Sequence, residues 1–299
     1  MNIIADSGST KTAWWIGEEE EGKLIYTQGI NPFQQNSEDI LTIITEGILP
    51  YISAASKIEH VWFYGAGCTP EKSLCIDRAL RLALGHSPSI FVGSDMLGAA
   101  RSLCRSTPGI ACILGTGRNS CYYDGNNIHL GNPALGFILG DEGSGAYIGK
   151  RLVGDILKHQ MPDDLCQAFF AETGKTQASI IECVYRSPLP NRFLASLSPF
   201  CHHHRSHPSM HLLLLDCFSQ FFIRNILSAP WPCQPTECPI HCAGSIAHYY
   251  EDELRQAAAL AGCTIGKIVQ SPIEGMIEYH KEQIITKHKY FEHQLYQST

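Results

Sequence analysis

The chain has 299 residues, a length that predicts about two domains and a core large enough to fold without disulfide bonds. Hydrophobic residues make up 44% of the sequence and charged residues only 17%, which excludes a mainly disordered chain. The formal net charge is −7. Because a protein that binds the nucleic-acid backbone needs a basic face, we do not expect nucleic acid to be the main partner.

The distribution of apolar residues argues against export and against a membrane. The N-terminus has neither a basic segment nor a long hydrophobic one, so no signal peptide is expected. The longest apolar runs, such as 212–215, are far shorter than the roughly 18 residues of a membrane helix. We therefore expect a cytoplasmic protein whose 13 cysteines are reduced and mostly buried.

The first third of the chain predicts three strands followed by alternating helices and strands. Short apolar runs between polar turns indicate the strands, and apolar residues at helical spacing after Ser37, the expected N-cap, indicate the first helix. In chain order the expected elements are strands 2–5, 13–16 and 23–27, a helix from Glu38 toward Tyr51, strand 61–64, a helix from Pro70 to the residue before Gly85, strand 90–92 and helix 96–104. This order is typical of an α/β domain.

The same pattern begins again after Pro108 and Gly109. Here an apolar strand, a loop of small polar residues and a second apolar strand follow one another as they do near residue 6. In chain order the expected elements are strands 110–114, 121–123 and 128–130, a mostly helical region from 144 to 227, strand 240–243, helix 246–260, strand 264–269 and a helix from Glu274 to the C-terminus. We therefore expect two related lobes, residues 1–106 and 107–280, with helix 281–299 long enough to pack back on the first.

Two loops carry the groups that a phosphate site requires. A bound phosphate needs backbone N–H groups at close approach, hydroxyl donors, and often a carboxylate that holds hydrated Mg²⁺. The loop 6–12 (Asp-Ser-Gly-Ser-Thr-Lys-Thr) offers all three, and Gly115-Thr116-Gly117 offers a second tight turn. A Walker A motif is excluded, because Phe169 stands where the motif ending at 174–176 requires a glycine.

Six motifs follow one another in the order and spacing of a known superfamily. They are residues 6–12, Ser94-Asp95, 115–119, 140–144 (Gly-Asp-Glu-Gly-Ser), 243–245 (Ala-Gly-Ser) and 271–275 (Ser-Pro-Ile-Glu-Gly). Through them the chain resembles the BadF/BadG/BcrA/BcrD ATPase family, within the superfamily of sugar kinases, Hsp70 and actin, over residues 2 to about 280. N-acetylglucosamine kinases are its most similar members. The resemblance implies an α/β, two-lobed actin/hexokinase-like (ribonuclease H-like) fold. In that fold each lobe is a mixed sheet with flanking helices, and ATP and substrate bind in the cleft.

The resemblance also implies which residues bind ATP and Mg²⁺. Asp6 matches the carboxylate that positions Mg²⁺, usually through water. The expected nucleotide contacts are Gly8, Ser9, Thr10 and Lys11 in the first loop, Gly115, Thr116 and Gly117 in the second, and Gly244 and Ser245 in the adenosine motif, where the glycine lets the nucleotide approach. Serines at positions 7 and 9 depart from the glycines common in the family, but serine still permits a tight turn.

Asp95 matches the catalytic carboxylate of the family. It lies between an expected strand and an expected helix, where cleft residues of α/β folds are found. A carboxylate there can act as the general base that takes the proton of an attacking sugar hydroxyl. Asp95 can also serve as the N-cap of the helix that follows, and the two roles are compatible.

The sugar contacts implied by the resemblance are Asn31, Asn119 and Asp141. Carboxylates and amides suit sugar hydroxyls because each can make two directional hydrogen bonds. For Asn31 the alternative is an ordinary turn before a proline, and for Asp141 with Glu142 it is negative charge at a helix N-terminus.

Two departures from the family pattern affect the choice of substrate. Arg118 stands where a small residue is common, and it could meet phosphate, meet an acidic sugar substituent, or be solvated. The segment 132–137 (Asn-Pro-Ala-Leu-Gly-Phe) lacks the tryptophan of the animal enzymes. N-acetylglucosamine, glucosamine and N-acetylmuramic acid therefore all remain open as the sugar.

The sequence thus favours an ATP-dependent kinase for the 6-hydroxyl of an amino sugar, with Mg²⁺ as cofactor. The expected partner is a small molecule, with neither nucleic acid nor membrane, and a homodimer is compatible with the sequence. The alternative is an activator ATPase of a 2-hydroxyacyl-CoA dehydratase or benzoyl-CoA reductase system, which needs paired cluster cysteines that the sequence does not offer. A non-catalytic sugar-sensing regulator is disfavoured by Asp95 and the two loops.

Two groups of cysteines and histidines have the residue types of a metal site. The first is Cys201 with the histidines 202–204, 207 and 211, and the second is Cys233, Cys238, His241 and Cys242. Consecutive histidines rarely point at one ion, and Cys242 lies inside an expected strand, so we expect a metal at neither.

Overall fold

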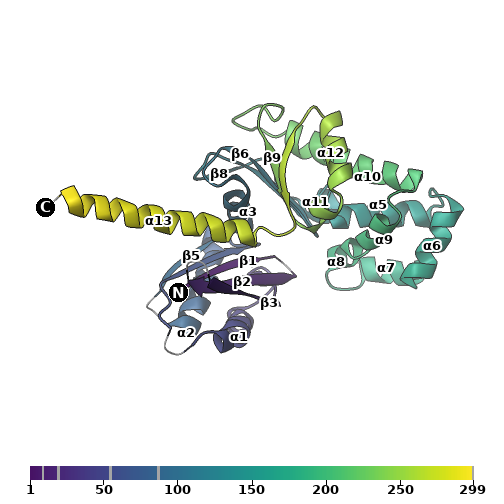
Figure 1. Cartoon of the computed structure of the whole chain (residues 1–299). Coiled ribbons are helices and arrows are strands. Elements are labelled where there is room, and N and C mark those ends of the chain that lie inside the picture. Colours follow the sequence, from purple (N-terminus) through teal and green to yellow (C-terminus); the bar gives the residue numbers. More distant parts are fainter. Residues whose placement is uncertain (9, 19–20, 54–55, 86–87, 298–299) are drawn as a thin grey trace. The chain divides into compact units, whose positions relative to one another are not determined.

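The chain folds into two compact units. The computed structural model describes residues 1–8, 10–18, 21–53, 56–85 and 88–297, with side chains of the last helix described up to residue 285 (Figure 1). One unit comprises Met1–Ser106 with Pro272–Thr299, and the other Thr107–Ser271. Residues 272–280 thus belong to the first unit and not to the second lobe as the sequence had suggested. The reason is that Ile273 and Met276 are buried in its core.

The first unit is built on a mixed five-stranded sheet with the order β3-β2-β1-β4-β5. The strands are β1 (Asn2–Ser7), β2 (Lys11–Glu18), β3 (Glu21–Gln28), β4 (His60–Gly65) and β5 (Ser89–Ser94). The first three are antiparallel neighbours, whereas β4 and β5 run parallel to β1. The three predicted N-terminal strands and the alternation that follows are therefore confirmed.

Four helices cover the two faces of this sheet. Helices α1 (Ser37–Ile48) and α2 (Pro70–Leu84) pack with Ile3 and Ala5 of β1, while α3 (Asp95–Cys104) and α13 (Ile273–Gln297) lie toward Ile4 on the other face (Figure 1). Because successive strand residues point to opposite faces, a strand covered on both sides is apolar throughout. The N-cap of α1 is Asn36 rather than Ser37, since its side chain accepts the N–H groups of residues 38 and 39. The 3₁₀ turn η1 (Leu49–Tyr51) follows this helix.

The second unit repeats the topology of the first. Its sheet has the order β10-β9-β6-β7-β8, in which β6 (Gly109–Leu114), β7 (Arg118–Tyr123) and β8 (Ile128–Leu130) are antiparallel. Strands β9 (Ile240–Ala243) and β10 (Ile265–Val269) run parallel to β6. Each unit thus has a three-stranded antiparallel part extended by two parallel strands, which confirms the predicted two-lobed α/β fold.

Most helices of the second unit lie between β8 and β9 in the sequence. They are α4 (Gly136–Leu139), α5 (Gly145–Leu157), α6 (Asp163–Thr173), α7 (Gln177–Tyr185), α8 (Pro190–Ala195), α9 (Ser198–His203), α10 (Pro208–Phe221) and the π-helical turn η2 (Phe222–Leu227). The single helix expected over 246–260 is two helices, α11 (Ser245–Tyr249) and α12 (Glu251–Leu260). They meet at Tyr250, which leaves helical geometry to bury its ring and donate its hydroxyl to the carbonyl of Ser198.

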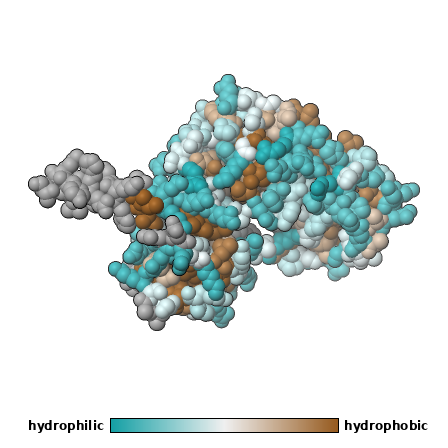
Figure 2. All heavy atoms as spheres, viewed as in Figure 1, coloured by the Kyte–Doolittle hydropathy of each residue, from teal (hydrophilic) through white to brown (hydrophobic). Residues whose placement is uncertain are grey.

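The most apolar helical segment is a core element. Pro208–Leu227 is long and apolar enough to cross a membrane by length and composition, but half of its most apolar window is buried. Met210, Leu214 and Phe218 are fully buried in the core of the second unit. The face of the molecule shown in Figure 2 is mainly hydrophilic, with hydrophobic residues in scattered patches.

The cysteines are mostly buried thiols, as expected. Among the described residues, nine of the eleven free cysteines are buried. Cys233 and Cys238, however, form a disulfide within the loop before β9. The expectation that all cysteines are reduced is therefore wrong for this pair, whose close spacing lets one loop bring the two sulfurs together.

Candidate active site

Two carboxylates meet at one edge of the first sheet. Asp6 is near the C-terminal end of β1, and Asp95 directly follows β5, so both lie where the parallel strands end. Burial and the charge of Asp95 raise the pKa of Asp6 to about 7, and the charge of Lys11 opposes this rise. Burial likewise raises the pKa of Asp95 to about 6. These two predicted site residues are therefore brought together by the fold.

The start of helix α3 holds Asp95 in place. Ser94, and not Asp95, is the N-cap of this helix, since its hydroxyl oxygen accepts the N–H of Leu97 at 3.2 Å. Asp95 is the first helical residue, and its Oδ1 accepts the N–H of Met96 at 2.9 Å. The capping role considered for Asp95 thus belongs mainly to its neighbour.

The first loop is a closed hairpin turn. The N–H of Gly8 donates to the carbonyl of Lys11 at 3.0 Å, and the carbonyl of Thr10 accepts from Gly29 at 3.1 Å. Lys11 lies 5.0 Å above the ring of Tyr26 and lowers the pKa of Asp6 through its charge. Ser9, an expected phosphate contact, lies outside the described residues.

Ser7 has a structural role that the sequence did not suggest. Its fully buried hydroxyl lies 2.7 Å from that of Thr12 and bonds both the N–H and the carbonyl of Ile30 at 3.0 Å. The serine that replaces a family glycine therefore points into the protein and ties the first hairpin to the segment after β3.

We expect Ser7→Ala to destabilise the protein by about 1–3 kcal/mol, because it removes the hydroxyl that bonds the buried N–H and carbonyl of Ile30. Thermal unfolding followed by circular dichroism measures the effect. Ser73→Ala removes a comparable but exposed hydroxyl that bonds the carbonyl of Pro70, and should change stability by less than about 0.5 kcal/mol. Equal shifts for the two variants would contradict the role given to Ser7.

Asn31 builds a local turn. Its Oδ1 accepts the N–H of Phe33 at 3.0 Å, and its own N–H donates to Oε1 of Gln35 at 2.8 Å. The same Oδ1 lies where a side chain at Gly67 would have to go, so the turn contacts the loop that follows β4. The turn considered as the alternative role is therefore present, and a sugar contact by the same residue remains a prediction.

The second loop is held by the start of helix α5. The carbonyls of Gly115 and Thr116 accept the N–H groups of Gly145 at 2.8 Å and Ala146 at 3.1 Å. In a trans peptide the C=O and the next N–H point in opposite directions, so the N–H groups of Thr116 and Gly117 point away from α5. Outward N–H groups in a tight turn are what phosphate binding requires.

Asp141 lies against this second loop. A side chain on Gly117 would come within 3.0 Å of its Oδ2, and the backbone N–H of Arg118 donates to its carboxylate. Burial raises the pKa of Asp141, while Arg118 lowers it through its charge. Its φ of 60° is in the left-handed region, which is uncommon for a non-glycine residue and is found often at functional sites.

The remaining expected residues of the second unit lie on β7 and in the turn that follows β9, and their ligand contacts stay predictions. Asn119 lies on β7, where its Oδ1 accepts the N–H of Ser120 at 2.9 Å, so its NH₂ group is the part it can offer to a ligand. Gly244 and Ser245 form the turn between β9 and α11. With φ of 119° and a Cβ position 2.2 Å from the carbonyl oxygen of Leu114, Gly244 is required by this packing, and its contact with a nucleotide remains a prediction.

Three buried polar side chains lie beside Asp141, and only two of them, Arg118 and Glu142, had been singled out from the sequence. Arg118 is only 5% exposed, so the alternative of a solvated arginine is wrong. It bonds Asn225, which in turn bonds Glu142. Sequence reasoning missed Asn225, although a polar pair at 224–225 inside an apolar helical run was a usable signal.

In neither of the two cysteine and histidine groups singled out in the sequence do the cysteines gather as metal ligands. Cys201 is buried in the core, and the Cys233–Cys238 pair is oxidised. Among the described residues, one group could hold a metal, namely Glu172, His203 and His204, whose ligand atoms lie within 4.8 Å of one another. Hydrogen bonds from both rings to the carboxylate already explain this geometry.

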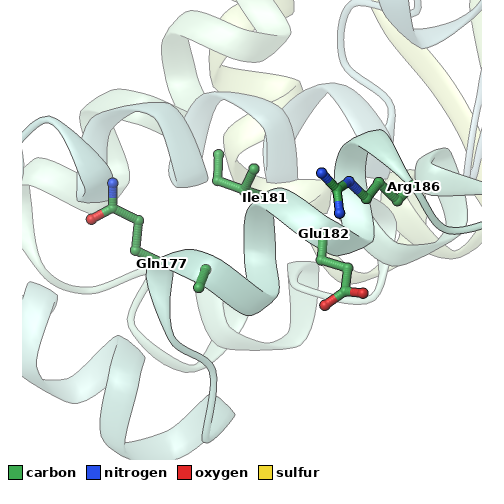
Figure 3. Close-up of a pocket in the computed structure, with 5 residues that line it drawn as sticks. Gln177, Ile181, Glu182 and Arg186 are labelled. Carbon is green, nitrogen blue, oxygen red and sulfur yellow. The ribbon is translucent and has the colours of Figure 1, made fainter.

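A surface pocket of about 580 Å³ lies along α7 and contains none of the predicted site residues. Its lining consists of Gln177, Ala178, Ile181, Glu182 and Arg186, all from α7 or its C-cap (Figure 3).

The duplicated sheets, each with a tight loop after its first strand, are the architecture of the two-lobed sugar kinases. No family model and no curated protein matches the sequence. The solved structure of a candidate N-acetylglucosamine kinase from Porphyromonas gingivalis is 47% identical, covers 94% of this chain and 99% of that chain, and has a TM-score of 0.89. The chain therefore belongs to the sugar kinase family of this protein. The BadF/BadG/BcrA/BcrD family name stays a prediction.

Two more distant structures share the fold alone. A candidate N-acetylglucosamine kinase from Chromobacterium violaceum is 17% identical with a TM-score of 0.68, covering 93% of this chain and 98% of that chain. A ROK family glucokinase from Streptomyces griseus, in complex with glucose and AMPPNP, is 12% identical with a TM-score of 0.51, covering 92% of this chain and 97% of that chain. The 47% identical structure indicates the enzyme class, an ATP-dependent sugar kinase.

Proposed function

We propose that the protein transfers the γ-phosphoryl group of ATP to the 6-hydroxyl of an amino sugar of the N-acetylglucosamine kind. The observation that carries this proposal is the 47% identity, over 94% of the chain, to a candidate N-acetylglucosamine kinase. Kinases of this class need a base for the sugar hydroxyl and groups that hold the phosphates. The residues at the two sheet edges supply both kinds of group.

Asp95 is the proposed general base. With a pKa of about 6 it is largely ionised at neutral pH and can accept the proton of an attacking hydroxyl. A pKa near the working pH also suits a group that must afterwards release the proton. The hydrogen bond from Met96 holds Oδ1, so Oδ2 is the oxygen that we assign to the sugar hydroxyl.

The two loops are the proposed phosphate contacts. In the first loop these are the backbone and side chains of residues 8–11, and in the second the outward N–H groups of Thr116 and Gly117. Lys11 adds a cation beside Asp6. In phosphoryl transfer such groups act by positioning and by stabilising charge, without forming bonds themselves.

The first unit offers a fitting place for Mg²⁺. Burial and, after it, the charge of Asp95 raise the pKa of Asp6 to about 7, and a divalent cation beside Asp6 would favour its ionised form. Carboxylate oxygens are the ligands that Mg²⁺ prefers. Asp6 would hold the ion, through water, and the ion would supply charge neutralisation of the phosphates.

The proposed sugar contacts are Asn31, Asn119 and Asp141. Of these, Asp141 has the most support, because a strained backbone and a buried charge beside the second loop are typical of a binding residue. The activator ATPase alternative gains no support. Among the described cysteines only Cys75 and Cys183 are free and not buried, and they lie in different units.

A coupled ADP-release assay with Mg-ATP and a panel of sugars tests the proposal. We expect turnover with N-acetylglucosamine, and lower kcat/KM with glucosamine, N-acetylmuramic acid and glucose. Absence of phosphorylation of every amino sugar by folded wild-type protein would reject the proposed function. Iron bound to anaerobically purified protein would instead favour the activator ATPase.

A further inference from the structure

Arg118, Asn225 and Glu142 form a buried bridge in the second unit. One guanidinium nitrogen of Arg118, Nη2, donates to Oδ1 of Asn225. The Nδ2 group of Asn225 donates to Oε2 of Glu142 at 3.1 Å. The three residues are 5%, 2% and 7% exposed, in the order Arg118, Asn225 and Glu142. An amide suits this place because it can accept from a cation and donate to an anion at the same time.

The backbone makes an unusual turn to present Asn225. Helix α10 ends in the π-helical turn η2, which carries residues 222–227. Such turns are rare and occur frequently at functional sites. Arg224 of the same turn lies 3.9 Å from Oε1 of Glu142, so the turn delivers two polar side chains to this one carboxylate.

Stabilisation of the fold does not explain why the bridge is present, because the bridge carries a cost in free energy. Within the part of the chain that the structure describes, Nε and Nη1 of Arg118 are buried and have no hydrogen-bond partner. Burial accordingly lowers the pKa of Arg118, and the nearby Glu142 and Asp141 oppose this effect. Buried charges with unmet hydrogen bonds are costly, and an apolar side chain is often at least as stable in such a place. Such a cost beside the second loop is better explained by function.

Two members of the bridge, Arg118 and Glu142, are direct neighbours of Asp141. The backbone N–H of Arg118 donates to the Asp141 carboxylate, and Glu142 is the residue that follows Asp141. Asn225 connects the side chains of these two neighbours. The left-handed backbone of Asp141 is thereby fixed against the beginning of β7.

We propose that Arg118, Asn225 and Glu142 are positioning residues of the sugar subsite, which hold the Asp141 carboxylate in the orientation that binds sugar hydroxyls. This inference rests on the proposed function, in which Asp141 contacts the sugar. The hydrogen bonds that the structure gives for the Arg118 and Asn225 side chains go to Pro133, Asn225 and Glu142, and not to residues 115–117 of the second loop. Loss of the bridge should therefore weaken the binding of the sugar and leave the binding of the nucleotide unchanged.

The test compares Arg118→Met, Arg118→Lys and Asn225→Leu with wild type in the coupled assay. We expect Arg118→Met and Asn225→Leu to raise KM for the amino sugar about tenfold or more, with KM for ATP within about threefold of wild type. Lysine keeps the charge and a donor toward Asn225, so Arg118→Lys should recover a large part of the loss. Arg255→Met is the control, because this arginine bonds the backbone carbonyls of Ile265 and Gly266 and lies on α12, and its loss should lower Tm without changing either KM.

A second readout keeps the inference separate from the proposed function. Hydrogen exchange of ligand-free protein should be faster over residues 139–144 in Asn225→Leu than in wild type, and unchanged there in Arg255→Met. Wild-type protein without any amino sugar activity would reject the proposed function, while exchange still decides whether the bridge holds this segment. An unchanged sugar KM in Arg118→Met, an equal rise in both KM values, or unchanged exchange would overturn the inference.

Discussion

Asp95→Asn is expected to lower kcat by about a thousandfold while leaving the protein folded. A positioned base contributes about 10²–10⁴-fold to such reactions, and an amide cannot take up the hydroxyl proton. The amide oxygen can still accept the N–H of Met96, so helix α3 should begin as before. Initial rates at saturating ATP and sugar give kcat, and KM for both substrates should change much less.

The same substitution should stabilise the ligand-free protein in a pH-dependent way. Because burial raises the pKa of Asp95 from 3.8 to about 6, the folded state favours the protonated carboxyl. The cost of the buried charge is absent below pH 4, grows as the pH rises toward 6, and is complete above it. Asparagine removes this cost, so its stability gain should be about 1–3 kcal/mol at pH 8 and near zero at pH 4.

The control for both effects is Asp77→Asn. This carboxylate is on α2 of the same unit, in a half-buried surface pair with Arg81 at 2.9 Å. Its substitution should change neither kcat nor the pH dependence of stability, because ion pairs at the surface of a helix contribute little. A kcat of Asp95→Asn within tenfold of wild type would remove Asp95 from the role of base.

The fold was predictable because its elements carry local signals. Apolar runs bounded by turns indicated the strands, and Pro70 and Gly85 marked the two ends of α2. The repeated order of strand, polar loop and strand predicted the duplication. What sequence could not indicate was set by tertiary packing: the break at Tyr250, and the docking of Ile273 and Met276 on the first sheet.

The candidate site was predictable to a similar extent. Asp6 and Asp95 were identified through the resemblance to the family, and for Asp95 the position between an expected strand and an expected helix supported the assignment. The bridge to Asn225 was missed because it joins positions 107 residues apart through a π-helical turn. No periodicity or motif encodes such a contact. Ser7 was assigned to the loop, whereas its hydroxyl faces inward, since orientation depends on the register of β1 with β2.

Gly244→Ala is expected to destabilise the second unit by about 3 kcal/mol or more. The added Cβ would lie 2.2 Å from the carbonyl oxygen of Leu114, and φ of 119° is strained for any side chain. Because the obstacle is backbone of the adjacent strand β6, neither partner can move away without disturbing the parallel pairing of β6 with β9. Thermal unfolding should show a fall in Tm of roughly 6–12 °C.

Two other glycines separate packing from ligand binding. Gly154→Ala, on helix α5, meets nothing within 4 Å and should leave Tm unchanged or raise it, because alanine is the better helix former.

Gly115 in the second loop also has open space at its Cβ, so Gly115→Ala should fold normally. If this loop binds phosphate, the same methyl should hinder the nucleotide and raise KM for ATP. A Tm for Gly244→Ala equal to that of Gly154→Ala would show that the turn between β9 and α11 tolerates a side chain. A KM for ATP unchanged by Gly115→Ala would instead remove the second loop from the nucleotide site.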